Sequence, residues 1–72
     1  RAAEKKRAAA IVALENRIEA AESSLREVEV ALADPSNYSN GARAKELVTR
    51  QRRTRDELDS LWKEMERVAE GK

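Results

Sequence analysis

The chain has 72 residues, of which 40% are charged and 3% aromatic, and its formal net charge is +1. Thirteen of its hydrophobic residues are alanines, which leaves 16 larger apolar side chains, fewer than a globular core of this size usually needs. We therefore expect a small piece of a longer protein and not a compact enzyme. Abundant Ala, Glu, Lys, Leu and Arg is typical of long helices or a coiled coil.

Missing residue types exclude several kinds of chemistry. The sequence has no Cys and no His, which removes disulfides, thiolate metal sites, and the commonest general base and metal ligand. Its two glycines cannot form a phosphate-binding Gly-rich loop. No apolar run approaches the roughly 20 residues of a transmembrane helix. We expect a soluble, cytoplasmic module without catalytic residues, metal, cofactor or membrane partner.

Residues 1–9 are basic and lack the apolar repeat that follows them. They include Lys5, Lys6 and Arg7. Glu4 and Arg7 stand where that repeat would require apolar side chains. We expect residues 1–9 to be a basic linker or the frayed start of a helix.

Residues 10–33 are predicted to form the first helix. Apolar residues recur there at alternating spacings of three and four, the a/d pattern of a coiled-coil seam, for about three heptads. The seam residues are Ile11, Leu14, Ile18, Ala21, Leu25, Val28 and Leu32.

Residues 34–40 contain the only cluster of turn-forming residues and are predicted to form the connection. Asp34 can cap a short turn that has Pro35 at its first position. Asn40 is the expected N-cap of the next helix, and Tyr38 is expected to pack over the tip near Leu32 and Leu47.

Residues 41–70 are predicted to form the second helix, whose seam is partly polar. A short connection between two long helices implies an antiparallel arrangement. The fold class is therefore all-α, a two-helix antiparallel coiled-coil hairpin over residues 10–70. The polar Gln51 and Thr54 are interpreted as fixing the register, with a hinge or partner site as the alternative. The second-helix seam residues are Leu47, Gln51, Thr54, Leu58, Leu61, Met65 and Val68.

The two seams predict one register. If Leu32 faces Leu47, the residue numbers of facing pairs add up to 79, and every seam residue then finds a seam partner. Trp62, at an e position, is expected to cover the open end of the seam against Glu15 or its neighbours.

A basic run begins the second helix. From Arg43 to Arg55 there are six basic residues and one acid, Glu46, whereas the remainder of this helix is mildly acidic. Arg55 is expected to pair with Glu22 or Glu29. Arg43 and Arg50 should face Ala31 and Ser24, which offer no partner charge.

The run has two interpretations, a solvated helix face and a polyanion contact. No aromatic residue interleaves it, so any nucleic-acid binding should be independent of sequence. The candidate nucleic-acid-binding residues are Arg43, Lys45, Arg50, Arg52 and Arg53.

Four segments together resemble the C-terminal domain of the ABC-F ATPases, the Uup type in particular. The resemblance covers about residues 10–68, and its most specific part is the Leu-x-Asp-Pro-x-x-Tyr turn followed some 24 residues later by Trp. The segments are 14–19 (LENRIE), 32–38 (LADPSNY), 46–47 (EL) and 61–66 (LWKEME).

The resemblance implies a parent protein with two ATP-binding cassettes that acts on ribosomes. It also implies DNA binding by this domain, as in Uup-like members, or contact with ribosomal RNA, as in others. Those roles would fall on the basic residues of the hairpin, and the ATPase domains of the same parent chain would be partners. The fragment itself lacks the cassettes and is not expected to hydrolyse ATP.

The alternative is a protein- or ribosome-interaction spacer hairpin that does not bind nucleic acid directly. Val12 and Val30 fall on outward positions, where a partner helix or a second copy could cover them. We expect a monomer or a weak homodimer.

Overall fold

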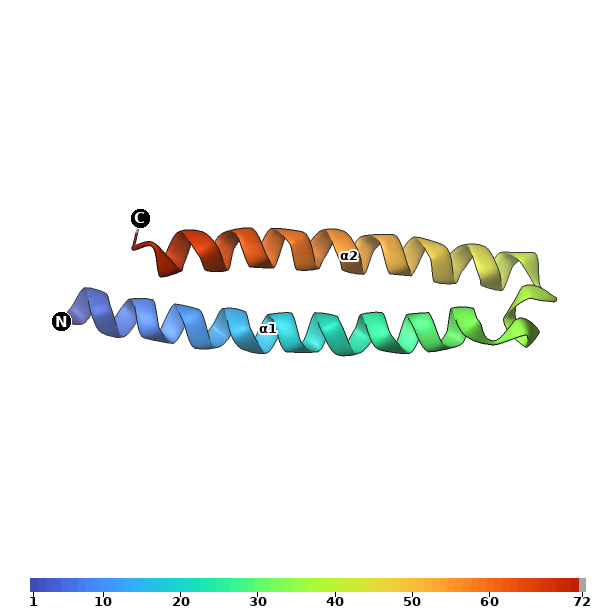
Figure 1. The fold of residues 1–72 in the computed structure, drawn as a ribbon, viewed down its shortest axis with the longest axis horizontal. Coiled ribbons are helices and arrows are strands. Elements are labelled where there is room, and N and C mark those ends of the chain that lie inside the picture. The colour runs from blue at the N-terminus through green and yellow to red at the C-terminus, as the bar shows by residue number, and fades with distance from the viewer. Residues whose placement is uncertain (72) are drawn as a thin grey trace.

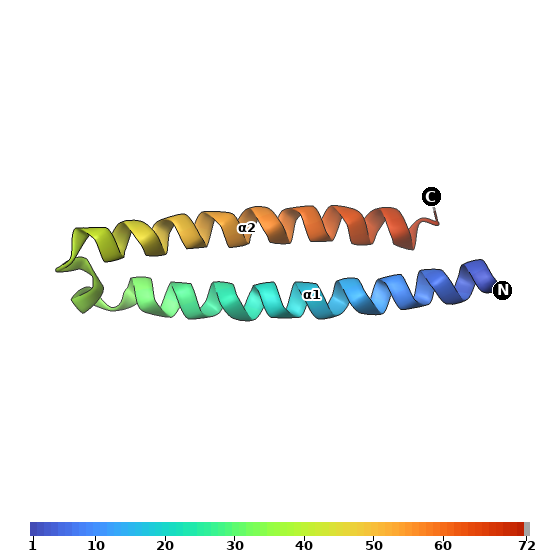
Figure 2. The same cartoon turned by 180° about the vertical axis from the view of Figure 1, so that it is seen from behind.

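The computed structural model describes residues 1–71 and consists of two long helices lying side by side (Figure 1). Helix α1 spans Ala2–Ala33, a 3-10 turn η1 spans Pro35–Tyr38, and helix α2 spans Gly41–Ala69. The hairpin measures 56 × 15 × 13 Å, and the view from behind shows the same antiparallel pair (Figure 2). The predicted all-α helical hairpin is therefore confirmed.

Helix α1 starts at Ala2, so the helix predicted over residues 10–33 continues back through residues 2–9. Alanine has the highest helix propensity of all residues, and this stretch is rich in it, so the helix extends beyond its last seam contact. The side chains of residues 1–9 are all exposed. A role for them as a linker or fraying end stays a prediction.

The end of α2 lies close to this extension. Gly71 has φ +75°, and its N–H donates to the carbonyl of Val68 at 3.0 Å, a left-handed ending that favours glycine. A Cβ at Gly71 would lie 2.9 Å from Nη2 of Arg7, so the guanidinium packs directly against this terminus.

The predicted seam is the only core along the described chain 1–71. Every seam residue is buried or half-buried, and the α1 and α2 seams face one another. The packing agrees with the predicted register, in which the residue numbers of facing pairs add up to 79. Leu61 belongs to the same core cluster as Ile18, its predicted partner, and Ala21. The buried seam residues are Leu14, Ile18, Ala21, Val28, Leu47, Thr54 and Leu61.

The polar part of the seam is satisfied within its own helix. Thr54 is only 7% exposed, and its hydroxyl donates to the carbonyl of Arg50 at 2.8 Å. Within residues 1–71 no buried side-chain polar atom lacks a hydrogen-bond partner. Thr54 therefore needs no partner from α1 or from another molecule.

The two predicted caps are present in the turn. The carboxylate of Asp34 accepts from the N–H of Ser36 at 3.0 Å, with Pro35 in the first turn of η1. The side chain of Asn40 accepts from the N–H groups of Ala42 at 3.0 Å and Arg43 at 3.3 Å. These bonds satisfy backbone donors that a helix start leaves free.

The turn is also tied back to α1. The Asn37 amide donates to the carbonyl of Ala31 at 2.6 Å, and the Tyr38 hydroxyl donates to the carbonyl of Leu32 at 2.5 Å. Tyr38 is nonetheless 55% exposed, so it holds the tip by its hydroxyl more than by the expected packing of its ring.

Replacing Leu61 by alanine should lower the free energy of unfolding by about 2–4 kcal/mol, because a seam side chain that is 2% exposed leaves a cavity. Urea denaturation followed by circular dichroism measures the change. The matched control is Val30→Ala on the outer face, where the residue is 73% exposed and the change should stay within about 0.5 kcal/mol. An equal loss of unfolding free energy in the two variants would contradict the assignment of Leu61 to the buried seam.

The Asp34 cap predicts a pH dependence. Hydrogen bonds from Ser36 lower the pKa of the Asp34 carboxyl below its ordinary value of 3.8. The stabilisation is therefore present above pH 3.8 and is lost as the pH falls through the lowered pKa. The difference in Tm between the native chain and Asp34→Ala should be largest near neutral pH and shrink in acid. A difference that grows in acid would show that the carboxylate is not the stabilising form.

Candidate nucleic-acid interface

The five predicted basic residues, here called the basic face, all lie on the half of α2 nearest the turn. All are exposed. Lys45, Arg50 and Arg53 line one shallow groove of about 470 Å³ together with Ala42, Glu46 and Thr49, whereas Arg43 and Arg52 lie outside it. The basic face consists of Arg43, Lys45, Arg50, Arg52 and Arg53.

Arg50 has a charged partner, which the sequence analysis did not foresee. Its Nη2 donates to Oγ of the facing Ser24 at 3.2 Å, as the register predicts, and also lies 3.6 Å from Oε2 of Glu27. Glu27 is not the facing residue, but it lies one turn along α1 from Ser24, within reach of a long arginine side chain. The expectation that Arg50 lacks a partner charge was therefore wrong.

Arg43 also has a partner, on its own helix. Its Nη1 lies 3.9 Å from Oε2 of Glu46, three residues further along α2. The heptad register relates only residues across the seam, so it did not predict this pair within α2. Both ion pairs are exposed, with side-chain exposures from 47% to 73%, and such pairs contribute about 0–1 kcal/mol.

The remaining three cations of the basic face form no ion pair with a carboxylate of the described residues. Within residues 1–71 the structure records no ion pair for Lys45, Arg52 or Arg53. Arg55 pairs with Glu29 at 3.5 Å, which confirms one of its two expected partners. The basic face therefore keeps a local excess of positive charge that α1 does not neutralise.

The spacing of these cations suits an extended polyanion. From Arg43 to Arg53 the helix rises by about 15 Å, which equals the rise of about four steps of a DNA strand. Arginine can contact a phosphate through two parallel N–H groups, and the small residues Ala42 and Thr49 line the same groove as Arg50 and Arg53. The geometry of these side chains is suited to phosphate contacts, and no aromatic side chain lies among them to stack on bases.

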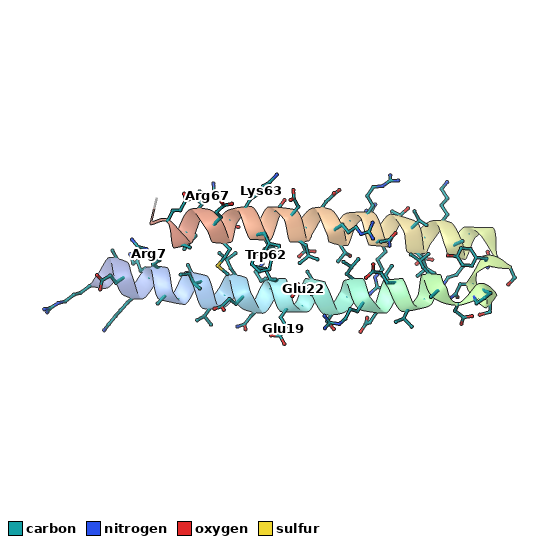
Figure 3. All side chains as sticks on the ribbon, viewed as in Figure 1. Arg7, Glu19, Glu22, Trp62, Lys63 and Arg67 are labelled. Atoms are coloured by element: carbon teal, nitrogen blue, oxygen red, sulfur yellow. The ribbon has the colours of Figure 1, made fainter. Side chains whose placement is uncertain are left out.

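The other half of α2 does not extend this surface. Its cations Lys63 and Arg67 point away from α1 (Figure 3), and Lys63 pairs with Asp59 at 3.0 Å. In the described part of the chain no three carboxylates, Cys or His residues gather closely enough to hold a metal ion. Neither helix of residues 1–71 has an apolar stretch that could cross a membrane.

Trp62 lines a second groove, at the open end of the hairpin, which its position in the heptad only partly predicted. Trp62 does lie beside Glu15 at the open end, but it is 52% exposed and lines a groove rather than closing the seam. The signal in the sequence was its e position between Glu15 and Glu22, which are one heptad apart on the facing helix.

Comparison with known families gives one match. The family model described as the ABC transporter C-terminal domain matches residues 2–70. The match includes the Ala-rich start of α1, which lay outside the resemblance noted in the sequence. Comparisons with curated proteins and with solved structures found no match.

Removing the partner of Arg50 should have little effect on folding. Glu27→Gln is expected to change the free energy of unfolding by less than about 1 kcal/mol, because the ion pair is exposed. Urea denaturation at low and at physiological salt measures it. A loss above about 2 kcal/mol would mean that Arg50 is committed to the hairpin and is not available to a ligand.

Proposed function

Because the chain belongs to the ABC transporter C-terminal domain family, we propose that it binds nucleic acid through its basic face at the C-terminus of an ABC-F ATPase of the Uup type. Binding would consist of phosphate contacts that do not depend on base sequence. A two-helix C-terminal domain of this kind is not itself catalytic. ATP binding, a cytoplasmic location and contact with the ATPase domains would follow from the parent protein.

One observation supports the proposal most strongly. Lys45, Arg52 and Arg53 are exposed and unpaired within residues 1–71, on the outer side of a helix whose seam is fully occupied by α1. Within the described chain these three cations make no ion pair or side-chain hydrogen bond that stabilises the seam. The ion pairs of Arg43 and Arg50 are exposed and contribute little to folding, so both arginines can bind a phosphate in place of the carboxylate with little loss of stability. A polyanion would gain from all five, through release of its counterions.

The basic face has no aromatic side chain among its cations, which favours a nucleic acid bound through its phosphate backbone. Tyr38 and Trp62 lie outside the run of cations, so no aromatic side chain is placed to stack on bases between them. Duplex DNA and structured RNA both present the phosphate backbones that this face could follow. We propose DNA as the first candidate and ribosomal RNA as the second.

Fluorescence anisotropy against duplex DNA, branched DNA and structured RNA tests the proposal. The affinity should fall steeply between low and physiological salt, with a log–log slope corresponding to about three to five phosphates. Combined Arg50→Glu, Arg52→Glu and Arg53→Glu substitutions should remove most of the binding, because repulsion replaces three phosphate contacts. The triple Gln variant should show an intermediate loss without repulsion.

The matched control reverses three cations on the other half of the hairpin, namely Arg17→Glu, Lys63→Glu and Arg67→Glu. It changes the net charge equally and should retain most of the binding. If both triple variants lost the same affinity, binding would depend on the overall charge of the chain and not on the basic face. No binding at low salt to any of the three ligands would refute the proposal.

A further inference from the structure

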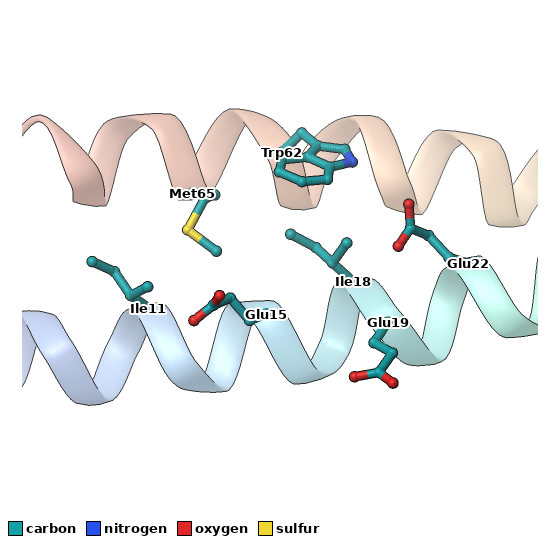
Figure 4. A pocket seen from close by; sticks show the side chains of 7 residues that line it. All are labelled: Ile11, Glu15, Ile18, Glu19, Glu22, Trp62 and Met65. Carbon is teal, nitrogen blue, oxygen red and sulfur yellow. The ribbon is translucent and has the colours of Figure 1, made fainter.

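The groove beside Trp62 lies toward the opposite end of the hairpin from the basic face. It has a volume of about 530 Å³ and is open to solvent along the junction of α1 and α2 (Figure 4). Its floor and one wall are apolar, and its α1 rim carries three carboxylates. The lining residues are Ile11, Glu15, Ile18, Glu19, Glu22, Trp62 and Met65.

The apolar side chains of the groove lie on or beside the buried seam, but part of their surface is exposed to solvent. Ile18 is 4% exposed and belongs to the seam, as does Leu61, which precedes Trp62 and is 2% exposed. The indole of Trp62 is therefore carried on a fixed backbone, yet the residue is 52% exposed. Met65 beside it has a flexible, polarizable side chain that can adapt to an incoming group.

Two carboxylates stand on either side of the indole. Glu15 and Glu22 lie one heptad apart on α1, and Figure 4 shows Trp62 between them along the hairpin, with Glu19 pointing away from α2. The structure records no ion pair or hydrogen bond for these three side chains within residues 1–71. The groove thus combines an uncovered apolar surface with unneutralised negative charge.

We propose that this groove docks a basic amphipathic helix of a partner protein. An apolar side chain of that helix would cover the half-buried Ile11 and Met65, and Lys or Arg residues on either side of it would pair with Glu15 and Glu22. The two glutamates are separated by about 10.5 Å along α1, which equals two turns of a partner helix. An arginine placed over the exposed indole would add a cation–π contact.

Other occupants match the groove less well. Its carboxylates repel a nucleic-acid backbone and an anionic membrane surface. A second copy would offer the cations of its basic face, but the groove among them is otherwise lined by Ala42, Glu46 and Thr49, none of them a large apolar side chain that could cover Met65, and sedimentation distinguishes this occupant. The inference is independent of nucleic-acid binding by the basic face.

Trp62 is the only tryptophan, so its fluorescence reports directly on the groove. The probe is a short Ala-based helical peptide with a central Leu, a Lys four residues before it and a Lys three residues after it. Titration of the whole chain should give a saturable change in Trp62 emission that weakens with salt. Binding should be about fivefold weaker in the double variant Glu15→Gln, Glu22→Gln, which loses two exposed ion pairs.

The matched control is the double variant Glu57→Gln, Glu64→Gln, a pair one heptad apart on the g flank of α2. It makes the same change in net charge and should bind the peptide as the native chain does. A peptide with Glu in place of Lys should not bind. The triple Glu variant of Arg50, Arg52 and Arg53 should bind the Lys peptide undiminished, which separates this proposal from the nucleic-acid one.

Three outcomes would overturn the proposal. These are no saturable change in Trp62 emission, equal weakening in both double variants, and a concentration-dependent dimer that Trp62→Ala abolishes. The last result, measured by sedimentation, would assign the groove to a second copy. Circular dichroism of each variant confirms that the hairpin is intact before binding is compared.

Discussion

The structure depends on one narrow apolar seam. Two helices without a third layer can exclude water only along the line where they meet, so each heptad contributes only two side chains to the core. Small Ala21 packs in the same cluster as Leu58 and Leu61, and Thr54 satisfies its own hydroxyl inside its helix. The relative axial position of α1 and α2 is thereby fixed, and with it the position of every surface charge.

That register divides the surface into two chemically different regions. Near the turn the basic face faces residues of α1 that neutralise only Arg50, through Glu27 at 3.6 Å. Near the open end the α1 glutamates face Trp62 and Met65, which carry no charge to pair with them. A rod with a formal net charge of +1 therefore presents a cationic surface and an anionic, partly apolar one, and each suits a different class of ligand.

The parts that sequence could predict were periodic or local. The heptad repeat located both seams, and the capping residues Asp34 and Asn40 act within three residues of their own positions. The ion pair of Arg50 was not predicted, because its long side chain reaches Glu27, one turn of α1 away from the facing Ser24. The helical start of α1 at Ala2 depends on alanine, which sustains a helix without tertiary contacts. The exposure of Trp62 depends on how far the facing side chains extend, which spacing alone does not give.

The turn is held by side-chain bonds to both helices, and at the far end Gly71 lies against Arg7, with the start of α1 extending beyond the end of α2 (Figure 1). The hairpin is thus a rod whose turn end carries the basic face and whose opposite, open end lies beyond Trp62. Over a length of 56 Å, a rotation of about 10° about the open end displaces the turn by about 10 Å, roughly the length of two helical turns. A small rotation of the hairpin about its open end would therefore be magnified at the turn, beside the basic face.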